Sequence, residues 1–431
     1  MSRQLAAADL TRRRILLGGM LAAPLRGHGA RAADTASLGD TVRALVQDPR
    51  QPLLSAAGLL MRDGEIVQQA QAGWARLAPA QAVSEHTLYR VASVSKLVVA
   101  VAVMRMVERG QLALDTDVGQ YLDFRPRHPA HPGQPITLRL LLSHRSGLSD
   151  ALGTRFADGQ ALRRSLRDPA AWLPQAPGRF FSYCNLAFGL IATVMEAVSG
   201  QRFDLLMDEL LLAPLGIVGG FNAASLPAEA QRRLASLCRR RGAQWLPQAD
   251  DAAAGPAAPP AELGQYQPGS NGTLFAPQGG LRISLPGLAR MLQLLLDQGR
   301  FEGQVLLQPA TVATMLNEHW RHAPSLANGD DFGGLFQAWG LGLQHFIDRS
   351  GPGYGDRLRR SGGLQAWGHV GDAYGLRAGF FFNPAQRWGM MYVINGLPDD
   401  PDTHPGRYSA FDRWEEPLLQ ALSAALPMPK G

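Results

Sequence analysis

The fold is decided by residues 89–110, which carry the sequence YRVASVSKLVVAVAVMRMVERG. This stretch contains Ser93, then Lys96 three positions later, then an uninterrupted apolar run over residues 97–104. The length of the run, a charged last turn and Gly110 at its end favour an α-helix over a strand. Because apolar residues occupy nearly every side of this helix, we expect it to be buried.

Ser93 and Lys96 have the spacing of a nucleophile and its base. Residues three apart lie on one helical face, so their side chains point into the same small space. A serine hydroxyl needs a group that accepts its proton, and a lysine amine can do so when burial lowers its pKa. The alternative is that Ser93 caps a helix and Lys96 pairs with a carboxylate.

The composition supports the catalytic interpretation of this pair. The chain has only two lysines, Lys96 and Lys430, against forty arginines. Arginine stays protonated inside proteins, whereas lysine can lose its proton. The sequence therefore has a lysine, and not an arginine, at a position that is predicted to be buried beside a serine.

Residues 1–33 are expected to be a signal peptide of the twin-arginine type. Arg12, Arg13 and Arg14 precede a short apolar run, and Ala30-Arg31-Ala32 has the small residues of a cleavage site. The run is too short and too interrupted to span a bilayer, and no cysteine follows it, so no stable membrane anchor is expected. The mature protein is expected to be periplasmic or secreted; the alternative is an ordinary cytosolic N-terminal helix.

Removal of this leader also removes most of the positive charge. The whole chain has a net charge of +6, and residues 1–33 hold six arginines and one acid, which leaves +1. With no large basic block in the remainder, nucleic acid is not expected as a partner. A single pair of cysteines, Cys184 and Cys238, makes no disulfide framework, and we expect both to be free thiols.

Strand-like runs near both ends, with helices between them, predict an α/β fold of the α+β type. We expect an antiparallel sheet built from both chain termini and flanked by helices, with an inserted, mostly helical lobe. The sheet domain would comprise residues 34–114 and 276–431, and the lobe residues 115–275. The expected strands are 53–62, 65–73, 364–370, 374–383 and 388–395. The expected helices are 41–47, 136–143, 159–167, 185–200, 203–211, 286–297, 309–318 and 411–426.

Several chemistries lack support in the sequence. It has no Gly-rich phosphate loop and no G-x-S-x-G elbow. The histidine pair at 128 and 131 lies in a proline-broken loop that would hold a metal poorly, and the pair at 319 and 322 has no third ligand at a sensible spacing. We therefore expect no metal and no cofactor.

Three separated patches of the chain resemble the motifs S-x-x-K, Y-x-N and K/H-T-G of the serine β-lactamase and penicillin-binding superfamily. The branch that contains class C β-lactamases, DD-peptidases and related esterases is the most similar. The patches are Ser93-Val94-Ser95-Lys96, Tyr183-Cys184-Asn185 and His369-Val370-Gly371. Neighbouring stretches at 136–148, 181–200 and 368–384 are similar too, so the resemblance spans essentially all of the mature chain.

The resemblance implies a role for each residue of the three motifs. Ser93 would attack a carbonyl and become acylated, with Lys96 and Tyr183 sharing the role of base in a way that the sequence leaves open. Asn185 would hold Lys96 and the substrate amide. The N–H groups of Ser93 and of Asp372, which follows Gly371, would form the oxyanion hole.

Simpler roles are open for three of the motif residues. Tyr183 is alternatively a buried aromatic residue at a helix start, Asn185 an ordinary N-cap, and His369 a strand histidine facing solvent. None of these roles requires catalysis.

Two departures from the motifs bear on the substrate. His369 stands where class C β-lactamases have lysine, and Val370 has no hydroxyl to donate to a substrate carboxylate. Such a substrate loses one hydrogen bond, worth about 1–3 kcal/mol in a buried site. Asp372 adds a carboxylate beside the expected oxyanion hole, which is unfavourable for anions.

The resemblance thus implies an exported serine hydrolase that cleaves an ester or amide in a small molecule or peptide. A carboxylesterase or a peptidase-like enzyme fits better than an efficient β-lactamase. The alternatives are a penicillin-recognising or peptidoglycan-binding protein without turnover, and a true class C β-lactamase. The sequence gives no oligomeric state.

Overall fold

The structure is a computed structural model, and it describes residues 36–251, 255, 257–398 and 404–426. The predicted signal peptide, residues 1–33, lies outside the described residues. Among the helices that are described, none has both the length and the apolar composition needed to cross a bilayer.

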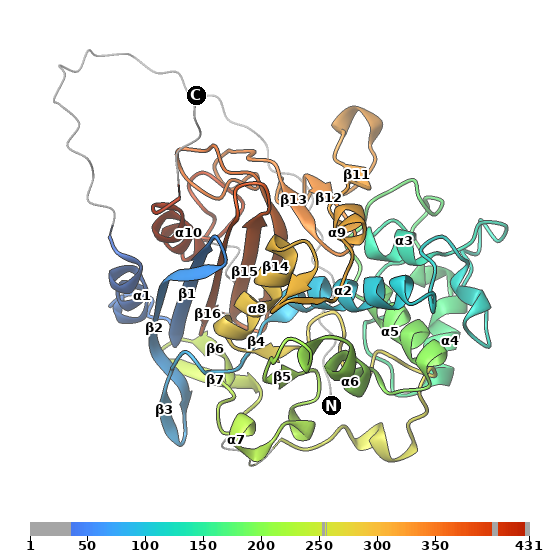
Figure 1. The fold of residues 1–431 in the computed structure, drawn as a ribbon, viewed down its shortest axis with the longest axis horizontal. Helices are drawn as coiled ribbons and strands as arrows, with labels where there is room; N and C mark the ends of the chain where they lie inside the picture. Colours follow the sequence, from blue (N-terminus) through green and yellow to red (C-terminus); the bar gives the residue numbers. More distant parts are fainter. Residues whose placement is uncertain (1–35, 252–254, 256, 399–403, 427–431) are drawn as a thin grey trace. The chain divides into compact units, whose positions relative to one another are not determined.

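Within these residues, strands from both ends of the chain form one antiparallel sheet, as the sequence predicts (Figure 1). Its nine strands follow the order β11-β12-β13-β14-β15-β16-β1-β2-β3. Their bounds are Ser55–Arg62 (β1), Glu65–Leu77 (β2), Ala80–Ala82 (β3), Trp320–Arg321 (β11), Ala338–Trp339 (β12), Gln344–Phe346 (β13), Ala366–Ala373 (β14), Leu376–Asn383 (β15) and Trp388–Asn395 (β16).

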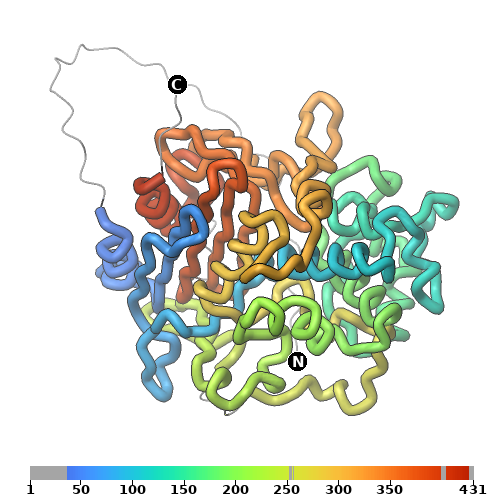
Figure 2. Tube along the Cα trace, in the orientation of Figure 1, coloured from blue at the N-terminus to red at the C-terminus, as the bar shows by residue number. Residues whose placement is uncertain are grey.

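The two halves of the sheet join where β1 pairs with β16. The register runs from Ser55 opposite Asn395 to Arg62 opposite Trp388, so segments more than 300 residues apart lie side by side (Figure 2). Every residue of β16 is buried. A strand buried on both faces needs an apolar sequence without polar alternation, and the sequence of β16, WGMMYVIN, meets this requirement.

Helices cover both faces of the sheet. On one face, α1 (Leu38–Gln47) and α10 (Glu415–Ser423) pack against β1, where an added Cβ at Gly58 would meet Leu38 and Leu422. On the other face, α8 (Leu285–Leu296) approaches β16 so closely that the side chain of Leu292 fills the space beside Gly389. The sheet is therefore the middle layer of three.

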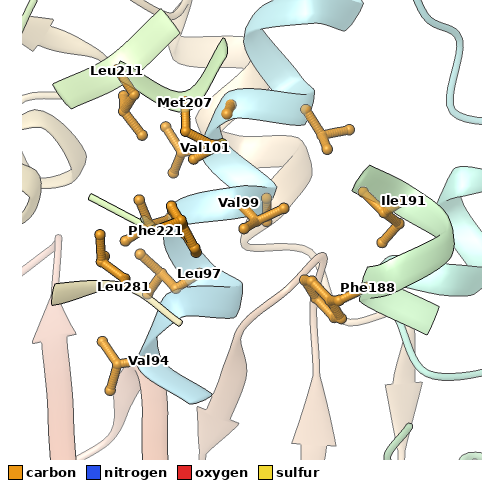
Figure 3. Packing of buried hydrophobic residues seen from close by; sticks show 14 of the residues in the cluster. Val94, Leu97, Val99, Val101, Phe188, Ile191, Met207, Leu211, Phe221 and Leu281 are labelled. Carbon is orange, nitrogen blue, oxygen red and sulfur yellow. The ribbon is translucent and has the colours of Figure 1, made fainter. Parts of the chain in front are cut away.

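The predicted central helix is α2, Ser95–Glu108, and each of its first ten residues is buried. Figure 3 shows its side chains between two neighbours: Leu97 lies near Leu281 and Phe221, and Val99 faces the helix that carries Phe188. The helix begins later than the sequence suggests. Residues 89–90 form a short strand, β4, and residues 92–94, which include Ser93, form a 3₁₀ turn.

The segment between α2 and α8 is rich in helices. These are α3 (Leu138–Leu142), α4 (Gly159–Arg167), α5 (Leu186–Ser199), α6 (Phe203–Met207) and α7 (Ala228–Gln231). The segment also contains a hairpin, β6 (Leu237–Arg241) with β7 (Gln244–Ala249), which the sequence analysis does not anticipate. The division of the chain into a sheet domain and an inserted lobe stays a prediction.

The remaining elements are short, and most of their strands are not among those expected from the sequence. The strands β5 (Gly219–Gly220) and β8 (Arg282–Ile283) pair beside β4, and β9 (Arg300–Phe301) pairs with β10 (Gln304–Val305). Helix α9, Pro309–Met315, ends three residues early. Tyr374 lies in the β14–β15 turn with Gly375, and its φ of +53° is typical of a tight hairpin turn.

A substitution in the turn between β12 and β13 tests how closely the sheet packs on α2. The N–H of Gly342 donates to the Leu142 carbonyl oxygen (2.9 Å), and an added Cβ at Gly342 would overlap the Cβ of Ala100 in α2. We expect Gly342→Ala to lower the free energy of unfolding by about 3 kcal/mol, from strain at its φ of +75° and from overpacking. Chemical denaturation measures this loss.

Gly303→Ala is the matched control. Gly303 has a φ of +81°, but an added Cβ there would meet no atom within 4 Å. This variant should lose only about 1–2 kcal/mol from backbone strain. Equal losses in the two variants would contradict the close packing of the turn on α2.

Candidate active site

Ser93 and Lys96 lie side by side at the start of α2, as their spacing predicts. Ser93 is in the 3₁₀ turn, and Lys96 is in the first turn of the helix and fully buried. The Lys96 Nζ lies 2.9 Å from the Ser93 Oγ. Burial lowers the pKa of the Lys96 amine to about 7, because the apolar surroundings disfavour its charged form. The amine is therefore much more readily deprotonated at neutral pH than an exposed lysine.

Two fixed oxygen atoms accept the other hydrogen bonds of the Lys96 amine. Its Nζ lies 2.8 Å from the Asn185 Oδ1 and 2.8 Å from the carbonyl oxygen of Gln278. A neutral amine has two N–H groups and one lone pair. If the two N–H groups donate to these oxygens, the lone pair faces the Ser93 hydroxyl, which is the arrangement needed to accept its proton.

Asp150 holds Asn185 in this position. One oxygen of its carboxylate accepts from the backbone N–H of Asn185 (3.0 Å) and from its side-chain amide (2.8 Å). The other accepts from the backbone N–H of Leu186 (2.8 Å). Asp150 thus caps α5 and turns the Asn185 Oδ1 towards Lys96. Asn185 occupies the N-cap position of α5, as its alternative assignment predicts, but its side chain makes no capping hydrogen bond and binds Lys96 instead.

Tyr183 completes the group around Lys96. The Lys96 Nζ lies 4.7 Å from the centroid of the Tyr183 ring, and Ser93 is close enough to the Tyr183 hydroxyl to lower the pKa of the phenol slightly. Burial raises the pKa of the Tyr183 phenol, so this group keeps its proton at neutral pH. The same apolar environment therefore favours a neutral amine at Lys96 and a neutral phenol at Tyr183.

The third motif lies on β14, beside the turn that carries Ser93. An added Cβ at Gly371 would lie 2.5 Å from the carbonyl oxygen of Val91, so the backbone of β14 passes directly against residues 91–92. The side chain of Asp372 is 67% exposed and forms an ion pair with Arg377. Its carboxylate is therefore partly neutralised before a substrate arrives.

His369 is fully buried, and its assignment as a solvent-facing histidine is wrong. Its Nδ1 lies 2.6 Å from the carbonyl oxygen of Val370, and its ring packs against Tyr183 and Trp339. Burial lowers the pKa of His369 to about 3. The third motif consequently supplies no positive charge from His369 at neutral pH.

The structure brings Ser93, Lys96, Tyr183, Asn185 and His369 together, with Gly371 and Asp372 on the adjoining strand. Three further residues contribute to the site and were not predicted from the sequence: Asp150, Gln278 and His144. His144 is buried, its Nδ1 accepts from the N–H of Cys184 (3.1 Å), and its ring lies 4.5 Å from that of Tyr183. Its place in the stretch 136–148, which resembles the family, is the signal that points to it.

Within the described part of the chain, neither the cysteines nor the residue types that can bind metal form a second functional site. Cys184 and Cys238 are both free and buried, which confirms the expectation of free thiols. Across the described residues, no group of three or more His, Cys, Asp or Glu side chains is arranged to hold a metal ion.

Comparisons with known proteins agree with the family that the sequence resembles. The family model described as Beta-lactamase matches residues 39–413. Esterase EstB of Burkholderia gladioli is 36% identical over 204 residues, which cover 43% of this chain and 51% of the esterase. Penicillin-binding protein 4 of Amycolatopsis lactamdurans is 26% identical over 64% of this chain and 66% of its own length. This chain therefore spans about half to two thirds of these two relatives.

The fold is also similar to that of solved structures. The octameric penicillin-binding protein homologue from Pyrococcus abyssi superposes with a TM-score of 0.65 at 19% identity, over 91% of this chain and 77% of that one. The family model covers residues 39–413, which is most of the sequence. The chain belongs to the β-lactamase family.

Proposed function

We propose that the protein is a serine hydrolase that cleaves an ester or amide through an acyl-enzyme on Ser93. The observation that carries this proposal is the buried Lys96 amine, 2.9 Å from the Ser93 Oγ and with a pKa of about 7. A base with a pKa near the working pH combines a large neutral fraction with a strong tendency to take a proton. The similarity to an esterase and to a penicillin-binding protein supports the same reaction class.

In the proposed acylation step, the neutral Lys96 amine accepts the Ser93 proton while the Ser93 Oγ attacks the carbonyl carbon. The negative charge that develops on the carbonyl oxygen is stabilised by the backbone N–H groups of Ser93 and Asp372. Tyr183 gives its proton to the leaving atom and takes one from Lys96. Water then hydrolyses the acyl-enzyme by the reverse transfers. Lys96 is the base in this scheme because burial lowers its pKa and raises that of Tyr183.

The third motif favours substrates without a free carboxylate next to the reacting carbonyl. Class C β-lactamases have lysine at the position of His369, whose low pKa keeps it uncharged here. Val370 has no hydroxyl group to donate. A β-lactam would therefore lose both a cation and a hydrogen bond, and esters or amides are the better substrates. A true class C β-lactamase is accordingly disfavoured.

The same departure supports a second candidate function, which is recognition of a penicillin-like or peptidoglycan ligand without turnover. In that case the protein would be acylated by an activated ester and would release no acid. Release of product in single-turnover experiments separates the two functions.

A fluorophosphonate that reacts with activated serines tests the nucleophile. We expect the wild-type protein to bind one equivalent and Ser93→Ala to bind none, measured by intact-mass spectrometry. We also expect Ser93→Ala to lose ester hydrolysis. Labelling of Ser93→Ala at the wild-type rate would refute the proposal.

Ser95→Ala is the matched control for this experiment. The Ser95 Oγ donates to the Ala92 carbonyl oxygen (2.6 Å) and accepts from the N–H of Leu281 (3.1 Å), so its role is structural. We expect this variant to be less stable, by about 1 kcal/mol or more, and still to be labelled. Loss of labelling in a folded Ser95→Ala protein would indicate that the assignment of Ser93 as the nucleophile is wrong.

We further propose that the protein is exported to the periplasm or beyond, as the charged and apolar pattern of residues 11–32 indicates. In a bacterial host, the full-length chain should be processed near residue 33 and recovered outside the cytoplasm. Replacing Arg13 and Arg14 together by lysine should leave the precursor inside the cell. Full-length protein in the cytoplasm for both forms, shown by fractionation and N-terminal sequencing, would contradict export.

A further inference from the structure

Next to Tyr183 lies an aromatic surface that the proposed chemistry does not use. We call it the aromatic rim: Phe332 and Phe336 contact Tyr183, and we include Tyr354, whose ring on a neighbouring loop lies against Gly334. The Phe336 ring stacks on Tyr183 at a centroid distance of 5.2 Å, and the Phe332 ring lies 6.3 Å from Tyr183 and 4.9 Å from Phe336. Phe336 is buried, whereas Phe332 is 52% exposed and Tyr354 is 41% exposed. Two of the three rings are thus open to a ligand.

The backbone of Phe332 is held in an unfavourable conformation. Its φ is +50°, and it is followed by Gly333 and Gly334 with φ values of +67° and +82°. A bulky residue in the left-handed region is strained, and glycine would make the same turn without this strain. Because the ring is half exposed, its burial offsets only a small part of this strain. Such strain is typical of residues kept for binding or catalysis.

The rim is fixed relative to Tyr183 from two sides. The loop that carries Phe332 is tied to Phe181, two residues before Tyr183: the N–H of Phe181 donates to the Asn328 carbonyl oxygen, and the N–H of Asp330 donates to that of Phe181 (both 3.0 Å). It is also tied to Tyr354, whose hydroxyl donates to the Asp331 carboxylate (3.2 Å).

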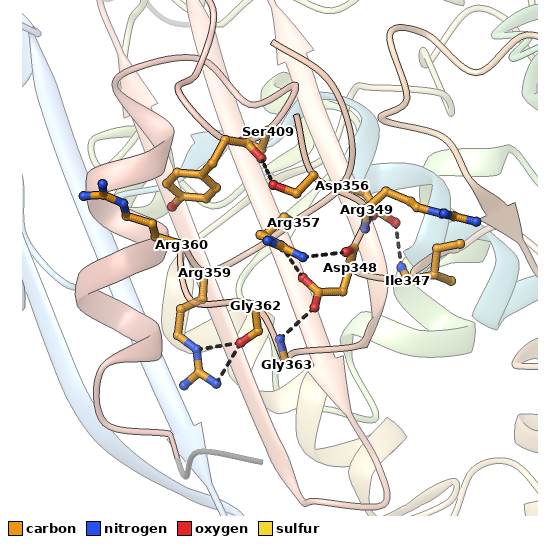
Figure 4. Close-up of polar contacts among 12 residues, drawn as sticks. Ile347, Asp348, Arg349, Asp356, Arg357, Arg359, Arg360, Gly362, Gly363 and Ser409 are labelled. Atoms are coloured by element: carbon orange, nitrogen blue, oxygen red, sulfur yellow. Dashed lines mark hydrogen bonds and ion pairs between the residues drawn. The ribbon is translucent and has the colours of Figure 1, made fainter. Parts of the chain in front are cut away.

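The loop that carries Tyr354 is itself cross-linked by two aspartates (Figure 4). Asp356 accepts from the N–H groups of Ile347 (2.6 Å) and Arg349 (2.7 Å). Asp348 accepts from the Arg357 Nε (2.8 Å) and from the N–H of Gly363 (2.7 Å). Because this surface is already ordered before binding, a ligand that binds there causes little further loss of conformational entropy.

The position of the rim identifies the part of the substrate that it contacts. In the proposed reaction, the Tyr183 hydroxyl protonates the leaving atom, so the group attached to that atom lies beside Tyr183, whose ring is 6.3 Å from that of Phe332. Aromatic rings pair with other rings by offset stacking or edge-to-face contact. We propose that the aromatic rim binds an aromatic group on the alcohol or amine part of the substrate. This inference rests on the proposed function.

Three esters test the rim through the effect of Phe332→Ala on kcat/KM. Benzyl acetate carries a ring on the leaving alcohol, ethyl phenylacetate carries one on the acyl side, and ethyl acetate has none. We expect the variant to lower kcat/KM for benzyl acetate roughly 3- to 10-fold, the value of one aromatic contact. The other two esters should change by less than about twofold. No change for benzyl acetate, or an equal change for all three esters, would overturn the inference.

Two further variants separate binding from a structural role. Phe332→Gly removes the ring and relieves the positive φ, so its Tm should equal or exceed that of the wild type while the benzyl preference is lost. A marked fall in Tm would show that the ring is structural and would overturn the inference. Leu326→Ala removes another exposed side chain from the same loop, 72% exposed, and should leave both the Tm and the three rates unchanged.

Binding to the Ser93→Ala protein separates failure of this inference from failure of the proposed function. Benzyl acetate binding is measured by saturation-transfer NMR, with and without the additional change Phe332→Ala. If no ester is hydrolysed but binding depends on Phe332, the rim stands and the hydrolase proposal fails. If esters are hydrolysed and neither binding nor rate depends on Phe332, the rim alone is refuted.

Discussion

The site depends on one buried amine with three hydrogen-bond partners. The Lys96 Nζ lies within 2.9 Å of the Ser93 Oγ, the Asn185 Oδ1 and the Gln278 carbonyl oxygen. A buried ammonium ion loses its hydration, and its pKa falls unless a carboxylate pairs with it directly. Asp150 raises the pKa of Lys96 only from a distance, because its carboxylate is bonded to the start of α5. The balance leaves the amine titrating at neutral pH.

The same burial disfavours the charged form of the lysine, the histidine and the tyrosine of the three motifs. It lowers the pKa of Lys96 and His369 and raises that of Tyr183. A proton acceptor for serine must be unprotonated at the working pH, and apolar surroundings keep a fraction of the Lys96 amine in this form. The apolar sequence of α2 is therefore a requirement of the chemistry as well as of the core.

Much of the fold and of the candidate site could be predicted from the sequence, because the features involved are local or repeat a known pattern. The spacing of Ser93 and Lys96 places both side chains on one face, and the alternation and turn residues locate most strands of the sheet. The role of Gln278 could not be predicted, because this residue contributes only its backbone carbonyl, which any residue type could supply. Asp150 could not be found either, because its bonds to α5 are formed by tertiary folding between residues 35 positions apart. Phe332 belongs to an irregular loop, where the conformation of a single residue decides what the ring contacts.

The most direct test of this account is the protonation of Lys96 itself. The chain has only two lysines, so protein labelled with ¹³C-lysine gives two Cε signals, and Lys430→Arg leaves that of Lys96. The Lys96 signal should titrate with a midpoint of about 7, protonated below it and neutral above it. Asp150→Asn should lower the midpoint, because it removes a negative charge that favours the ammonium form. A midpoint near 10.4, the ordinary value for lysine, would contradict the account.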